Sequence, residues 1–230
     1  LLGIALGRLL ELLDRARREN FRVNLFEAYD EPWKRRWEGT VGGYWGLFDS
    51  ADRKPKYPAG EAIGNQPFWK LQMASGLALC IGVFASALLT LRRRPSQPGL
   101  ASWIAVAISA TVVGILFGLG AEKMLHESFG YGGWLLQGLL LAAGIAAPLL
   151  STHALLSGRA LPAFVDVLGP PKDRTPFFMT NMLGITLIVT TVIAVQIALS
   201  LVFDARWRDF PFASLTMAVV PFWTLAFLNL

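Results

Sequence analysis

The sequence has a single cysteine in 230 residues and few charged side chains, which make up 16% of the chain against about 25% in ordinary soluble domains. One cysteine excludes a disulfide scaffold. The charge is also unevenly spread, because 22 of the first 70 residues are charged but only 15 of the following 160. This composition excludes a disordered chain and a soluble protein with a single core. We predict a water-soluble first part and a membrane-embedded second part.

The sequence also lacks a concentrated positive charge. The formal net charge is +5, but the first 70 residues are almost neutral, with a balance of +2. The other three positive charges lie between apolar runs, where Lys and Arg gather for reasons of membrane topology. We therefore predict no nucleic-acid partner.

Long apolar runs dominate the second part. Each has about the ~20 residues that are needed to cross the hydrocarbon of a bilayer, and such helices would need a far larger protein to cover them as a core. Few polar residues interrupt them, among them Gln137, His153, Asn181 and Gln196. We predict a multi-pass α-helical membrane protein in contact with the lipid bilayer, with a linker at 61–70 and a transmembrane bundle at 71–230. The five predicted spans are residues 71–91, 101–121, 134–157, 177–203 and 211–230.

The loop charges predict the orientation of the bundle. The loops after the first and third spans hold six positive residues: Arg92, Arg93, Arg94, Arg159, Lys172 and Arg174. The opposite loops hold three: Lys123, Arg206 and Arg208. Because positive residues favour the cytoplasmic side, the side of Arg92–Arg94 is predicted to be cytoplasmic. Residues 1–70 then face outward, into the periplasm if the membrane is a bacterial inner membrane.

The first part has the pattern of an incomplete α/β domain. Residues 1–19 are amphipathic and predict a helix, whereas residues 21–29 are rich in β-branched and aromatic residues and predict a strand. One helix, one strand and a loop cannot bury a core alone. The chain also starts without Met and ends within an apolar run, so we expect it to be a fragment of a longer protein.

The segment from Glu27 to Phe48 mixes carboxylates with aromatic residues. This mixture suits sugar binding, because aromatic faces cover the C–H surfaces of a pyranose while carboxylates and Lys bind its hydroxyls. A charged loop whose tryptophans pack onto neighbouring helices is an equally good interpretation of the spacing. The residues concerned are Glu27, Asp30, Glu31 and Glu38, with Tyr29, Trp33, Trp37, Tyr44 and Trp45.

A resemblance favours the sugar-binding interpretation. The stretches FRVNLFEAYDEPWK (21–34), EGTVGGYWGLF (38–48) and KYP (56–58) resemble the C-terminal end of family 17 glycoside hydrolases. These enzymes are β-1,3-glucanases and related glucosyltransferases with a TIM (β/α)8 barrel. The match covers roughly residues 1–60 and is closer to a bacterial membrane-bound branch, in which multiple spans follow the barrel. Some members of that branch also contain a family 2 glycosyltransferase module.

The resemblance implies supporting roles for several residues. Glu31 matches the acidic residue after the last barrel strand, and Lys34 and Glu38 match residues that shape the sugar subsite. The catalytic glutamates of the family come from earlier strands, and no stretch here matches them. Glu27 with Glu31 fits no family motif for the two carboxyls that a retaining glycosidase needs. We therefore expect no catalytic residue in this chain. The side chains expected to stack on sugar rings are Trp33, Trp37, Tyr44 and Trp45.

The predicted function is that of a fragment of a membrane-anchored β-1,3-glucan hydrolase or glucosyltransferase, inactive alone. Its expected partners are a β-glucan and the bilayer, with a glycosyltransferase module or subunit as a further possibility. No cofactor or metal is expected. The alternative is a membrane module for polysaccharide transport or assembly, or a structural anchor without catalysis of its own.

Two weaker patterns lie in the apolar part. Glu122, His126 and Glu127 could share a helix turn as metal ligands, since Glu122 and His126 are four residues apart, but a solvated turn at the membrane interface is the more common use of such residues. Gly114 and Gly118 form a GxxxG pattern, which predicts close packing of this helix against a neighbour.

Overall fold

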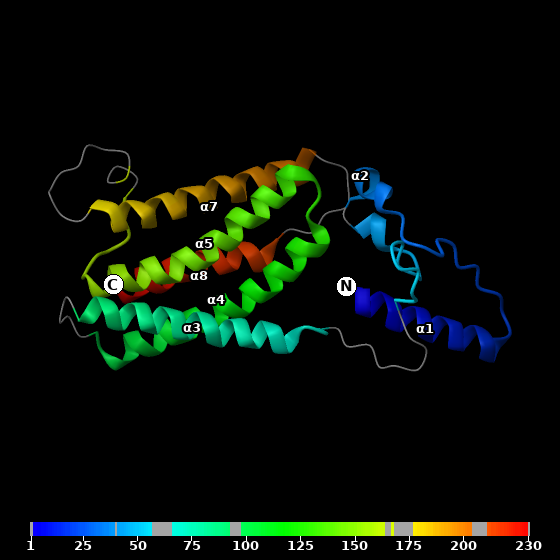
Figure 1. Ribbon diagram of the computed structural model, residues 1–230, viewed down its shortest axis with the longest axis horizontal. Coiled ribbons are helices and arrows are strands. Elements are labelled where there is room, and N and C mark those ends of the chain that lie inside the picture. Colours follow the sequence, from blue (N-terminus) through cyan, green and yellow to red (C-terminus); the bar gives the residue numbers. More distant parts are fainter. Residues whose placement is uncertain are drawn as a thin grey trace. The chain divides into compact units, whose positions relative to one another are not determined.

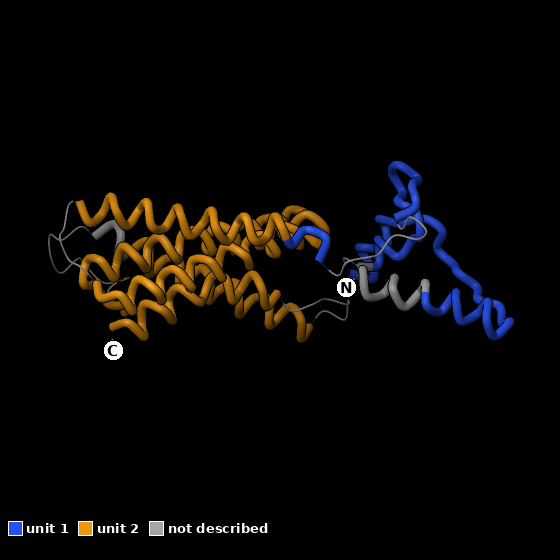
Figure 2. Tube along the Cα trace, turned by 90° about the horizontal axis from the view of Figure 1, so that it is seen from below, with its two compact units in different colours: residues 1–69, 206–208 blue, residues 70–205, 209–230 orange. Residues whose placement is uncertain are grey.

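A computed structural model describes residues 2–39, 41–56, 66–92, 98–163, 167, 177–203 and 211–229. The chain divides into two compact units, which are described separately below (Figure 2). The first unit comprises residues 1–69 with 206–208, and the second comprises residues 70–205 with 209–230. This division agrees with the change in composition near residue 70.

The first unit begins with the predicted helix, α1 (Leu2–Glu19). Arg15 pairs with Glu19 at 2.8 Å one turn later, and the basic residues of the last turn suit the negative end of the helix dipole. Asn20 has a φ of 55°, and the N–H of Phe21 donates to the carbonyl of Ala16 at 3.1 Å. This is the Schellman ending of a helix, with Asn at the left-handed position.

The strand predicted over residues 21–29 does not form. Within the described residues of this segment, only Tyr29 pairs, in a single parallel bridge with Phe48. Two backbone hydrogen bonds make the pairing, from Asp30 N to Phe48 O and from Phe48 N to Ala28 O. An extended segment becomes a strand only where a neighbour satisfies its backbone groups over several residues. The terminal βα part of a barrel is therefore not observed and stays a prediction.

Short helices follow in the segment that was predicted to be a loop. They are η1 (Pro32–Lys34), α2 (Arg35–Glu38) and η2 (Val41–Tyr44). Pro32 begins η1, where its missing N–H costs nothing. Gly39, with a φ of 83°, ends α2 in a conformation that favours glycine.

The second unit is a helical bundle (Figure 1). It contains α3 (Trp69–Leu91), α4 (Leu100–Glu127), α5 (Gly130–Leu156), α7 (Phe177–Phe203) and α8 (Phe212–Leu228). In the described part of the chain, four helices are long and apolar enough to cross a membrane: α3, α4, α5 and residues 181–203 of α7. The fifth predicted span corresponds to α8, a shorter apolar helix of 17 residues. The bundle is that expected of a helical membrane protein.

Apolar clusters hold the bundle together. One cluster joins α5, α7 and α8 through Ala147, Leu183 and Phe222. A second joins the same helices nearer their other ends through Leu140, Ile193 and Leu215. A third joins α3 to α4 and contains Val83, Val106 and Ala110. α5 also packs Leu149 and Leu155 against the third cluster, so it is in contact with all three and lies at the centre of the unit.

The GxxxG pattern lies where α4 packs against α3, as predicted. A Cβ atom on Gly114 would lie 2.6 Å from both the Cα of Gly76 and the carbonyl oxygen of Ser75. A Cβ on Gly118 would lie 2.6 Å from the Oγ of Ser75. The Ser75 hydroxyl also donates to the carbonyl of Gly114 at 2.7 Å. The two backbones are therefore in direct contact, which only glycine permits here.

Candidate functional site

Lys34 forms ion pairs with two glutamates in the candidate site of the first unit. Its ammonium group pairs with Glu27 Oε1 and, at 2.7 Å, with Glu31 Oε2. Glu27 and Lys34 are largely buried, whereas the side chain of Glu31 is 38% exposed. The hydrogen bonds with Glu27 and then Glu31 raise the pKa of Lys34 above its usual value. Lys34 therefore stays charged at any physiological pH and holds the exposed carboxylate of Glu31 in place.

Glu27 adopts a strained backbone conformation. Its φ of 70° lies in the left-handed region that non-glycine residues rarely occupy. Its Oε2 atom is buried and, among the described residues, has no hydrogen-bond partner. Such strain persists only where the surrounding structure imposes it, and it is concentrated at functional sites. The ion pair with Lys34 is the contact that holds Glu27 there.

A second buried ion pair supports the site. Asp30, whose side chain is 2% exposed, pairs with Lys56. Asp30 Oδ1 also accepts the N–H of Gly46 at 3.0 Å, and Lys56 donates to the carbonyl of Tyr44 at 2.8 Å. A Cβ on Gly46 would overlap the backbone nitrogen of Asp30. These contacts join three segments that are far apart in the sequence.

The structure brings together some of the predicted site residues and not others. Glu31 and Lys34 are in direct contact, as their spacing of three residues in a helical turn allows. Glu38 instead packs against η2, because a Cβ on Gly42 would lie 2.5 Å from the Cβ of Glu38. Lys56 was missed as a site residue. Its partner lies 26 residues away, and no local pattern reveals such a contact.

The aromatic residues of the site are exposed rather than packed away. Trp33, Trp37 and Trp45 are 63%, 67% and 59% exposed. The ammonium of Lys34 lies 5.7 Å from the ring centre of Trp33. Tyr44 is half-buried and has Arg35 over its ring at 5.3 Å.

Glu27 and Glu31 are the two carboxylates of the site that could be compared with a catalytic pair. A glycosidase needs a protonated carboxylic acid and a second carboxylate on either side of the bond. Here Glu27 and Glu31 both accept hydrogen bonds from the same ammonium group. Both carboxylates are therefore held by one ammonium group.

The second candidate, Glu122 with His126, forms contacts within the bundle. Gln72 Nε2 donates to the carboxylate of Glu122 at 3.0 Å, and His126 Nδ1 lies 2.8 Å from the backbone oxygen of Glu122. In the part of the chain that the structure describes, no three His, Cys, Asp or Glu residues lie close enough to hold a metal.

Comparison of the chain with protein-family models, with curated proteins and with solved structures found no match.

Proposed function

We propose that the first unit forms part of a binding site for β-1,3-linked glucose units, within a membrane-anchored glucan hydrolase or glucosyltransferase of bacterial family 17 type. The observation that carries this proposal is the cluster at 31–34. Within four residues it combines a partly exposed carboxylate, a buried ammonium and a tryptophan that is 63% exposed. A carboxylate accepts hydrogen bonds from sugar hydroxyls, and an indole face covers apolar C–H groups.

The contacts around Glu31 support a role in binding. Lys34 pairs with the carboxylate of Glu31 and also with the largely buried carboxylate of Glu27. The orientation of Glu31 is thus determined before a ligand arrives, which lowers the entropic cost of binding. The resemblance to family 17 enzymes matches Glu31 to the acidic residue after the last barrel strand, and Lys34 to a residue that shapes the sugar subsite. The expected partners are a β-glucan and a glycosyltransferase module or subunit.

We expect Glu31→Gln to weaken binding of laminarihexaose, a β-1,3-linked oligosaccharide, to the full chain by about tenfold or more, because hydrogen bonds to charged groups contribute about 1.5–3 kcal/mol. Titration calorimetry in detergent micelles measures this. Trp33→Ala is expected to weaken binding as well, through the loss of its stacking face.

Two matched variants serve as controls. Glu11→Gln changes an exposed glutamate on α1, and Trp223→Ala removes a tryptophan on α8 that is 73% exposed. Both should bind as the unchanged chain does. If laminarihexaose does not bind the unchanged chain, or if the β-1,4-linked cellohexaose binds equally well, the proposal of a site for β-1,3-linked glucose units on this chain is wrong. If Glu31→Gln binds laminarihexaose as tightly as the unchanged chain does, Glu31 has no role in binding, but the rest of the proposal is unaffected.

The proposed orientation places the first unit in the periplasm and the loop of Arg92–Arg94 in the cytoplasm of a bacterium. A fluorescent protein fused after Arg94 should therefore fluoresce, and alkaline phosphatase fused there should be inactive. Fusions after Ser128, in the loop between α4 and α5, should give the opposite results. The reverse pattern at both positions would overturn the orientation.

A further inference from the structure

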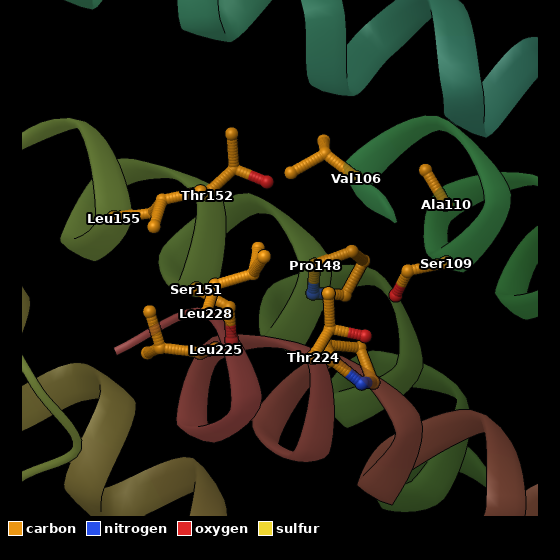
Figure 3. A pocket seen from close by; sticks show the side chains of 11 residues that line it. Val106, Ser109, Ala110, Pro148, Ser151, Thr152, Leu155, Thr224, Leu225 and Leu228 are labelled. Carbon is orange, nitrogen blue, oxygen red and sulfur yellow. The ribbon is translucent and has the colours of Figure 1, made fainter. Parts of the chain in front are cut away.

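A small pocket lies between α4, α5 and α8, near the ends at which α5 and α8 finish (Figure 3). Its volume of about 10 Å³ is about what one water molecule needs. Four of its lining residues have hydroxyl groups, and two are prolines inside helices. The lining residues are Val106, Ser109, Ala110, Pro148, Ser151, Thr152, Leu155, Pro221, Thr224, Leu225 and Leu228.

Three of the hydroxyl-bearing residues of the pocket are buried in the bundle. Ser109, Ser151 and Thr152 are each exposed by 6% or less. Thr224 satisfies its hydroxyl within α8, where it donates to the carbonyl of Val220 at 3.0 Å. Ser151 Oγ, in contrast, is fully buried and has no hydrogen-bond partner among the described residues. A buried hydroxyl without a partner is unfavourable, and an unobserved water is a common explanation.

Each of the two prolines in the lining leaves one carbonyl of its own helix without the usual helical donor. Pro148 and Pro221 lack the N–H that the carbonyls of Gly144 and Met217, four residues earlier, would otherwise accept. These two residues are neighbours across the helix crossing, since a Cβ on Gly144 would overlap the sulfur of Met217. α5 and α8 therefore cross where each has a carbonyl without its usual helical partner.

We propose that this pocket binds one ordered water molecule. The water accepts a hydrogen bond from the hydroxyl of Ser151 on α5 and forms a second hydrogen bond with Ser109 on α4, so that it connects the two helices. Water fits better than an ion because the lining residues, all within the described chain, include no charged side chain. A buried cation without a counter-charge is strongly unfavourable. A water molecule both accepts and donates hydrogen bonds, so it can accept from the hydroxyl of Ser151 and donate to that of Ser109.

The sign of the effect of Ser151→Ala tests the proposal. If water fills the pocket, the variant loses a satisfied hydrogen bond, and the midpoint of thermal unfolding of the full chain in detergent should fall by about 2–4 °C. If the pocket is dry, the variant removes an unpaired hydroxyl, and the midpoint should stay or rise. The second result would overturn the proposal.

A double-mutant cycle shows whether Ser109 and Ser151 share the water. The double variant Ser109→Ala with Ser151→Ala should lower the unfolding midpoint by less than the sum of the falls caused by the two single variants. The control is Ser200→Ala in α7, whose hydroxyl donates within its own helix to Ile197 O at 2.9 Å. Its effect should add to that of Ser151→Ala. Additive effects of Ser109 and Ser151 would exclude a shared water.

Two further measurements address the nature of the ligand directly. A high-resolution structure of the full chain should show a density peak within hydrogen-bond distance of Ser151 Oγ, and an empty pocket would refute the proposal. The unfolding midpoint should be the same in sodium, potassium and choline chloride. A rise specific to sodium that Ser151→Ala abolishes would identify a cation and overturn the assignment of water.

Discussion

Replacing Gly114 by valine is expected to separate α3 from α4 and to destabilise the membrane bundle by about 1–3 kcal/mol or more. The two atoms that the new Cβ would meet, at 2.6 Å, are the Cα of Gly76 and the carbonyl oxygen of Ser75. Both belong to the backbone of α3, so no side-chain rotation relieves the overlap. The hydrogen bond from Ser75 Oγ to the Gly114 carbonyl is lost when the helices move apart.

The thiol of Cys80 can report on the separation of α3 from α4. Cys80, the single cysteine, is half-buried on α3, and its Sγ lies 3.9 Å from the carbonyl oxygen of Ala107 on α4. We expect a maleimide to label Cys80 faster in Gly114→Val, together with a lower unfolding midpoint in detergent.

Gly82→Val is the matched control for this prediction. Gly82 lies in α3, the helix that contains Cys80, but a Cβ built on it meets nothing within 4 Å. The rate of Cys80 labelling and the unfolding midpoint of this variant should therefore stay close to those of the unchanged chain. Equal behaviour of the two variants would show that the α3–α4 contact is not tight.

Asp30→Ala should unfold the first unit around the candidate site, at a cost of about 3–5 kcal/mol. The variant leaves Lys56, whose side chain is only 14% exposed, without its counter-charge. The N–H of Gly46 loses its acceptor at the same time. Removing one partner of a buried pair costs more than the pair contributes, because the other charge stays away from water.

Limited trypsin digestion of the full chain in increasing urea measures this effect, followed by mass spectrometry of cleavage after Lys34 and Lys56. Cleavage at both sites should begin at a lower urea concentration in Asp30→Ala. Asp52→Ala makes the same chemical change in an exposed pair, in which Asp52 lies 3.1 Å from Lys54, and should change the cleavage little. Resistance that is unchanged in Asp30→Ala would contradict the structural role of the buried pair.

Local patterns were sufficient to predict the helices. The periodicity of residues 1–19 predicted α1, and hydropathy located α3, α4, α5 and α7 to within a few residues of the observed bounds except at the end of α4. A membrane-type helix satisfies its backbone hydrogen bonds within one segment, so its composition and length decide its existence. The GxxxG pattern also correctly indicated the tight face of α4, because small side chains are the local condition for close approach.

The sequence by itself thus determined the membrane character of the chain, its helices and the residue types of the candidate site. Only the tertiary structure decided that residues 21–29 pair at Tyr29 alone, that Glu27 and Glu31 share Lys34, and that Lys56 neutralises Asp30. It also decided that the hydroxyls of α4 and α5 meet two prolines in one pocket. Some of these contacts join residues that are more than a hundred positions apart in the sequence. They depend on the path of the whole chain rather than on any local pattern.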